Sequence, residues 1–169
     1  LAGGLCATLR DGRFACDPRW RPPPPWLPSP SWRPPYTEHP GLRGAAQVIG
    51  CVASVGCSGC ARFEDGTARC WGDGELPDGR LRASVSPVRA DVPNTFVTLG
   101  AGGRHACGLT REGTVWCWGD YLGAKGFHSG EARHRPSQIE GVTDVTQLAV
   151  GAWETCALVR GGGVVCWGG

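Results

Sequence analysis

The sequence predicts an all-β protein built from small antiparallel sheets that repeat along the chain. Nine residues separate two cysteines four times, at Cys6 and Cys16, Cys60 and Cys70, Cys107 and Cys117, and Cys156 and Cys166. These units recur at steps of about 50 residues, which is typical of a repeat architecture. No window of about eleven residues has the apolar period of a helix. The expected fold class is therefore all-β, with one hairpin at the centre of each repeat.

The hairpin is clearest at residues 106–120, which read ACGLTREGTVWCWGD. Two apolar runs flank a three-residue turn that Thr110 and Thr114 close, and this hairpin type requires a left-handed residue at Gly113. Glycine meets that requirement without steric cost. The equivalent glycines of the other copies are Gly12, Gly66 and Gly162.

The cysteines of each hairpin are predicted to form a cross-strand disulfide. Counting outward from the turn places Cys107 opposite Cys117 in a non-hydrogen-bonded pair, where side chains approach most closely. Such a bridge closes a small loop and stabilises by about 2–3 kcal/mol in the chain-entropy model. Ten cysteines in this pattern indicate an oxidising compartment, so we expect a secreted, periplasmic or cell-surface protein. The predicted pairs are Cys6 with Cys16, Cys60 with Cys70, Cys107 with Cys117, and Cys156 with Cys166.

Two further cysteines, Cys51 and Cys57, lie outside the repeated spacing, and Cys57 forms a C-x2-C with Cys60. A Cys51–Cys57 disulfide is the favoured interpretation, because the repeat already uses Cys60 and Cys70. The alternatives are free or intermolecular thiols, a structural zinc site of four thiolates, and a redox-active C-x2-C. We expect no bound metal.

Other segments supply the remaining strands of each repeat. Apolar runs at 44–60, 96–102 and 145–151 are expected to form inner strands. Pro87 and Pro136 each come after a polar connector and are followed shortly by an apolar residue, Val88 and Ile139, which suggests one more edge strand in each unit. Each repeat therefore contains about four short strands.

A proline-rich segment separates the first hairpin from the rest and holds ten of the fourteen prolines. In polyproline II, Trp20, Trp26 and Trp32 would line one face. This segment is a ligand for a proline-recognising partner, or an insertion that lies against the protein's own surface or is low-complexity sequence. The expected division of the chain is a degenerate first hairpin at 1–17, the Pro/Trp-rich insertion at 18–43, two repeats at 44–95 and 96–144, and a truncated repeat at 145–169.

Both faces of the third hairpin are apolar, which decides how the sheets must be arranged. Leu109 and Val115 share a face with the cysteines, whereas Trp116 and Trp118 point to the other. A sheet that is apolar on both faces must be covered on both. Four-stranded sheets stacked around an axis satisfy this demand, and that arrangement is the β-propeller.

Two segments resemble the repeat of the RCC1 (regulator of chromosome condensation) family. Residues 99–109 read LGAGGRHACGL and 112–120 read EGTVWCWGD, while 148–158 read LAVGAWETCAL and 162–168 read GGVVCWG. The Cys-x9-Cys-Trp-Gly variant is similar to a bacterial, exported branch of that family. The resemblance implies seven blades in a full-length member, so this chain would be a partial β-propeller of about three to four RCC1-like blades. The sequence contains no methionine, and we expect it to be part of a longer or processed product.

Composition and residue spacing give little support for catalysis, cofactors or nucleic acid. The net charge is +2, too small to imply nucleic acid or an anionic membrane, and no apolar run reaches the roughly 20 residues of a membrane span. The histidines lack partners at metal or triad spacing, and we expect His105 to be a structural residue hydrogen-bonded to a neighbouring backbone group. A basic stretch at 128–135 is a solvated loop or a contact for an anion or partner.

The prediction is a non-enzymatic scaffold that presents connector loops to a protein partner, with no cofactor. RCC1-family members act as binding scaffolds, which is what the resemblance implies here. One alternative is a propeller-based hydrolase or lyase with its site in other blades, and another is an RCC1-type nucleotide-exchange or chromatin-binding regulator. Aromatic and arginine side chains dominate interface hot spots. The candidate binding residues are Trp153, Tyr121, Phe127, Arg133 and Arg135.

Overall fold

The structure is a computed structural model of the 169-residue chain. It describes residues 6–8, 14–16, 37–38, 40–50, 58–72, 76–78, 84–92, 95–103, 105–119 and 133–168. Within these residues the regular elements are β-strands and one 3-10 turn, η1 (Pro40–Leu42). The all-β prediction is confirmed for this part of the chain.

The strands form four antiparallel sheets. The first contains β1 (Cys6–Thr8), β2 (Phe14–Cys16) and β3 (Thr37–Glu38). The second contains β4 (Ala45–Gly50), β5 (Ser58–Phe63), β6 (Ala68–Gly72) and β7 (Ser84–Arg89). The third contains β8 (Phe96–Ala101), β9 (His105–Thr110), β10 (Val115–Gly119) and β11 (Arg133–Gln138). The fourth contains β12 (Val145–Val150), β13 (Glu154–Val159) and β14 (Val164–Gly168).

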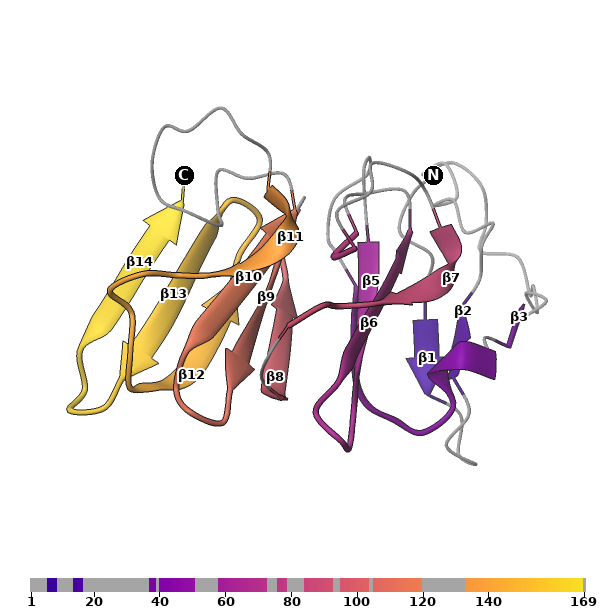
Figure 1. The fold of residues 1–169 in the computed structure, drawn as a ribbon, viewed down its shortest axis with the longest axis horizontal. Coiled ribbons are helices and arrows are strands. Elements are labelled where there is room, and N and C mark those ends of the chain that lie inside the picture. The colour runs from indigo at the N-terminus through magenta and orange to yellow at the C-terminus, as the bar shows by residue number, and fades with distance from the viewer. Residues whose placement is uncertain are drawn as a thin grey trace, which may run out of the picture.

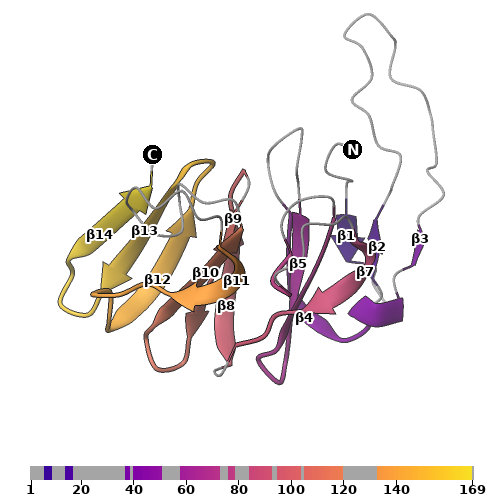
Figure 2. The ribbon, with the colours of Figure 1, turned by 45° about the horizontal axis from the view of Figure 1, so that its top comes forward.

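The sheets lie side by side in chain order, as Figures 1 and 2 show from two directions. The predicted inner strands are present as β4, β8 and β12, and the predicted edge strands around Pro87 and Pro136 are β7 and β11. Within the segment predicted as a Pro/Trp-rich insertion, Thr37–Glu38 adds a third strand to the first sheet. The three tryptophans of that insertion lie outside the described residues.

The hairpin turn has the predicted three-residue form in the second, third and fourth sheets. In the third sheet the Thr110 N–H donates to the Thr114 carbonyl at 2.9 Å, and the Gly113 N–H donates to the Thr110 carbonyl at 3.1 Å. Gly113 has a φ of 78°, in the left-handed region. Gly66 and Gly162 occupy the same place with φ values of 79° and 91°. The turn type therefore follows from the local sequence in all three copies.

The strand register places the cysteines of each hairpin opposite one another, as predicted. The structure joins Cys60 to Cys70, Cys107 to Cys117 and Cys156 to Cys166, with Cα atoms 4.0–4.1 Å apart. In the first sheet the backbone register pairs the predicted partners Cys6 and Cys16. Cys51 and Cys57 lie outside the described residues.

The core lies in layers between neighbouring sheets. Between the second and third sheets, the Cys60–Cys70 disulfide packs in one cluster with Phe96, Leu99 and Trp118. Between the third and fourth, the Cys107–Cys117 disulfide packs with Trp167 in the next cluster. Each layer thus brings the disulfide face of one sheet against the tryptophan face of the next. This arrangement confirms the two-faced apolar sheet expected from the sequence.

The ring of Trp71 approaches the backbone of the neighbouring strand closely. Trp71 is paired with Gly59 across β5 and β6. A Cβ atom at position 59 would come within 2.7 Å of the indole. The ring therefore occupies the space that any larger residue would fill, and Trp71 is buried.

Hydrogen bonds at fixed positions join successive sheets. The carbonyl of the turn glycine accepts from the first inner-strand N–H of the next sheet, Gly66 from Phe96 at 2.8 Å and Gly113 from Val145 at 3.0 Å. Gln47 adds a second link, because its amide oxygen accepts from the Leu99 N–H at 2.9 Å. Its amide nitrogen donates to the Leu99 carbonyl at 3.0 Å. These contacts fix the position of the third sheet relative to the second, and of the fourth relative to the third, along the direction of the strands.

The first prediction concerns the turn glycine. The substitution Gly113→Val should lower the free energy of unfolding by more than about 1 kcal/mol, because a β-branched residue resists a positive φ. Its Cβ would also lie 3.2 Å from the Val145 nitrogen of the next sheet. Gly162→Val is the matched control, since that turn is equally left-handed but has no atom within 4 Å of the added Cβ. Chemical denaturation should show the larger loss for Gly113→Val, and an unchanged stability would contradict the turn assignment.

The second prediction concerns the amide link between sheets. Gln47→Met keeps the length of the side chain but leaves the backbone groups of the buried Leu99 without their partner, which costs about 1–2 kcal/mol. Gln147 has the same place in the fourth sheet and is exposed. Gln147→Met should therefore change the unfolding free energy by less than about 0.5 kcal/mol. Equal losses in the two variants would show that the amide link does not stabilise the stack.

Candidate protein-binding surface

The turn between β12 and β13 carries Trp153, one of the predicted binding residues. The Gly151 N–H donates to the Glu154 carbonyl at 2.8 Å and closes the turn. The Ala152 carbonyl accepts from the Gly103 N–H of the third sheet at 2.9 Å. Trp153 lies between these two anchors with 57% of its surface exposed. A large aromatic side chain is thus presented to solvent from a backbone that two sheets hold in place.

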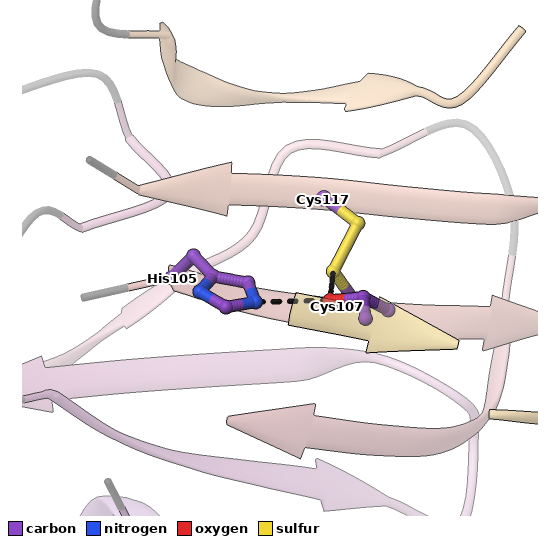
Figure 3. The surroundings of a disulfide bond; sticks show 4 residues. His105, Cys107 and Cys117 are labelled. Atoms are coloured by element: carbon purple, nitrogen blue, oxygen red, sulfur yellow. Dashed lines mark hydrogen bonds between the residues drawn. A yellow bond between two sulfur atoms is a disulfide. The ribbon is translucent and has the colours of Figure 1, made fainter. Parts of the chain in front are cut away.

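A buried polar contact supports the strand that follows this turn. His105 Nε2 lies 2.9 Å from the hydroxyl of Thr155 in the fourth sheet. The same hydroxyl is 3.8 Å from Cys107 Sγ, and Figure 3 shows His105 beside the disulfide with both interactions dashed. Thr155 is fully buried and His105 is 6% exposed. The base of the Trp153 turn is therefore fixed to the third sheet by a side-chain contact as well as by the backbone.

The expectation of a backbone partner for His105 was wrong, because the side chain binds a hydroxyl of the next sheet. The pattern of one repeat cannot reveal a partner that lies 50 residues further along the chain. Burial lowers the pKa of His105, and the negative charge of Glu154 raises it in part. The imidazole is therefore kept neutral to a lower pH than in an unfolded chain.

The other predicted binding residues are only partly placed. Arg135 is exposed on β11, the outer strand of the third sheet, and Arg133 begins that strand. Tyr121 and Phe127 lie outside the described residues, as does most of the basic stretch 128–135. The structure thus places Trp153 and the two arginines on different elements of adjacent sheets.

The metal-binding alternatives can be compared with the residues that the structure describes. No group of three His, Cys, Asp or Glu side chains among them is placed to hold a metal ion. Cys60 is bonded to Cys70, so it is available neither as a zinc ligand nor as the second thiol of the C-x2-C. Among the same residues, no helix has the length and hydrophobicity that crossing a membrane requires.

Sequence reasoning missed two residues that matter in the structure. Gln47 binds the backbone of the next sheet, and its recurrence as Gln147 at the same place in the fourth sheet was the available signal. Arg62 stands where the third and fourth sheets have Leu109 and Leu158. Comparing equivalent positions of the repeats would have found both.

The third prediction follows from the buried imidazole. Because the pKa of His105 is lower in the folded than in the unfolded chain, the unfolded state takes up a proton first as the pH falls below the ordinary value of 6.5. The contribution of His105 to stability is therefore complete above that pH and is lost as the pH falls towards the native pKa. The slope cannot exceed about 1.4 kcal/mol per pH unit for one proton.

Urea unfolding between pH 7.5 and pH 5 would measure this dependence. His105→Asn should flatten the curve relative to the parent chain, because the remaining titrating groups are the same in both proteins. Parallel curves would show that His105 does not titrate differently in the folded and unfolded states.

Comparison with protein families identifies the repeat. Residues 96–120 match the Regulator of chromosome condensation (RCC1) repeat. This segment contains β8, the β9–β10 hairpin and the Cys107–Cys117 disulfide. A comparison with curated proteins found no matching sequence.

Solved structures share the arrangement of the sheets. Yeast RCC1 (Prp20) bound to Kap60 has a TM-score of 0.64 at 18% identity, over 79% of this chain and 34% of that one. Prp20p from Saccharomyces cerevisiae, studied for its binding to Gsp1p and histones, has a TM-score of 0.57 at 24% identity, over 66% and 28%. Human WBSCR16 has a TM-score of 0.63 at 22% identity, over 79% and 37%.

This chain spans about a third of the length of these proteins. The identities are low, so the similarity establishes the fold and not the activity. The Cys-Trp-Gly hairpin, the layered packing and the match at the third sheet agree with one another. The chain therefore carries an RCC1 repeat at residues 96–120 and has the fold of part of an RCC1-type β-propeller.

Proposed function

We propose that this chain is part of a non-enzymatic protein-binding scaffold of an exported or cell-surface protein. The observation that carries the proposal is the presentation of Trp153. Its indole is largely exposed, while both neighbouring residues of its turn are tied to strands or to the adjacent sheet. An exposed tryptophan on a fixed backbone loses little conformational entropy on binding, and tryptophan is enriched among hot spots.

The disulfides support the proposed compartment. Each of the three hairpins whose side chains are described is closed by one, and four of these six cysteines are fully buried. Disulfides of this kind persist in oxidising environments and are rare where thiols are kept reduced. Alkylation and mass spectrometry of the native protein without reductant should find the cysteines bridged. Ten alkylated thiols would contradict an exported role.

The comparisons support protein binding as the use of this fold. Two of the similar structures concern yeast RCC1 and its interactions with Kap60, Gsp1p or histones. A nucleotide-exchange or chromatin role is accordingly the second candidate for this chain. The hairpin disulfides argue against it, because the cytosol and nucleus keep such thiols reduced.

The fourth prediction tests the scaffold role. Affinity capture with the parent chain from the medium or envelope of the source organism should recover a partner, and Trp153→Ala should weaken that binding by about tenfold or more. The melting temperature should remain unchanged, since the indole is largely exposed. Val164→Ala is the control, because Val164 is similarly exposed on a different part of the fourth sheet. Equal binding by all three proteins would exclude Trp153 as a hot spot.

A further inference from the structure

A polar hollow of about 170 Å³ lies where the hairpin turn of the second sheet meets the third sheet. Glu64 and Asp65 line it from the turn, and Val97 lines it from the inner strand β8. Arg62 lies on β5 just before the turn, and Arg111 belongs to the turn of the third sheet. Two guanidinium groups and two carboxylates therefore surround one small space between neighbouring blades.

The second sheet departs from its neighbours at this place. In the third and fourth sheets a leucine and a valine face each other, Leu109 with Val115 and Leu158 with Val164. In the second sheet the same positions hold Arg62 and Ala68. Leu109 and Val115 are buried in the layer against the next sheet. A charged group and a methyl group thus replace two branched apolar side chains of the core.

The protein satisfies only part of the hydrogen-bonding capacity of Arg62. Its Nη1 donates to the Phe63 carbonyl at 3.2 Å. Its Nε is buried and has no hydrogen-bond partner among the described residues. A surface arginine that extends past apolar groups keeps its charged head in water, but part of this guanidinium is withdrawn from it. A buried donor without a partner costs free energy, and packing gives no reason for an arginine here.

Among the charged side chains that line the hollow, the positively charged Arg62 is the least exposed. Arg62 is half-buried, whereas Arg111, Glu64 and Asp65 are exposed at the edge. Asp65 is engaged within its own turn, because it accepts from the Thr67 N–H at 2.9 Å and from the Thr67 hydroxyl at 2.7 Å. The hydrogen bonds from Thr67 lower the pKa of Asp65, and the charges of Arg89 and Arg69 lower it further. The Arg62 guanidinium, whose Nε has no partner among the described residues, therefore retains hydrogen-bonding capacity for an anion.

We propose that this hollow binds the carboxylate of an acidic side chain of a protein partner, with Arg62 and Arg111 as hydrogen-bond donors. The inference rests on the proposed scaffold function for the source of the carboxylate. Arginine pairs with carboxylates through charge-assisted hydrogen bonds, which are stronger than neutral ones. Glu64 at the edge favours a partner segment in which a basic residue adjoins the acidic one, and the exposed Val97 offers an apolar contact beside it.

The fifth prediction is tested by NMR titration of the 169-residue chain with N-acetyl-glutamate amide. Saturable shifts are expected at the backbone amides of Gly66, Thr95 and Val97, which line the hollow. The neutral isostere N-acetyl-glutamine amide should produce none of them. Arg62→Leu should raise the dissociation constant by about tenfold or more, because it removes a charged donor.

The variants separate binding from folding. Arg62→Leu restores the leucine of the other sheets, so it should fold and melt at or above the temperature of the parent chain. Arg160→Leu is the matched control, because Arg160 is exposed, follows the fourth-sheet strand as Arg111 follows that of the third, and does not line the hollow. It should titrate like the parent.

Equal shifts with the glutamine probe, or parent-like binding by Arg62→Leu, would overturn the proposal. The titration uses no partner protein, so these outcomes leave the Trp153 test of the scaffold role unaffected. Loss of partner capture in Trp153→Ala with no response to the glutamate probe would support the scaffold and reject the hollow.

Discussion

The stacking of a disulfide face on a tryptophan face is the contact on which the rest of this structure depends. The third sheet is apolar on both sides, so it could not lie in water alone. The Cys60–Cys70 bridge is covered by the sheet that carries Trp118, and the Cys107–Cys117 bridge by the sheet that carries Trp167. In the fourth sheet the same positions are open, and Val164 is 65% exposed where Val115 is fully buried. A side chain on the face of a sheet is therefore buried only where a neighbouring sheet covers that face.

Apolar stacking alone would let the sheets slide, and polar contacts between neighbouring sheets prevent it. Between sheets, the turn glycine carbonyl binds one end of the inner strand, as Gly113 binds Val145. Between the second and third sheets Gln47 binds Leu99 in the middle of the inner strand β8, and between the third and fourth sheets His105 contacts Thr155 on β13. Because each contact has one geometry, the turns that connect the strands are held in place along with them. In the proposed function, this rigidity lets Trp153 bind a partner with little loss of conformational entropy.

The features that the sequence predicted are those that act within about ten residues. The register of Cys107 and Cys117, the left-handed Gly113 and the two apolar faces all follow from the turn type and the two-residue period of a strand. The partner of His105 and the role of Gln47 could not be read in the same way, because each lies one repeat away. The hollow could be recognised only by comparing equivalent positions of the sheets, because Arg62 is unusual only when it is set beside the leucines of the third and fourth sheets.

Comparing equivalent positions of the repeats distinguishes residues that pack between the sheets from residues that this packing does not require. A leucine faces a valine in the third and fourth sheets, and in the third this pair fills the layer against the next sheet, so an arginine facing an alanine departs from that packing. Trp153 lies on the turn that enters β13, whereas the hollow lies beside a hairpin turn, at the opposite end of the strands. Figure 1 shows the hairpin turns of the last three sheets along one edge. A partner that used both features would have to reach around the stack, so the two proposed contacts are treated as separate.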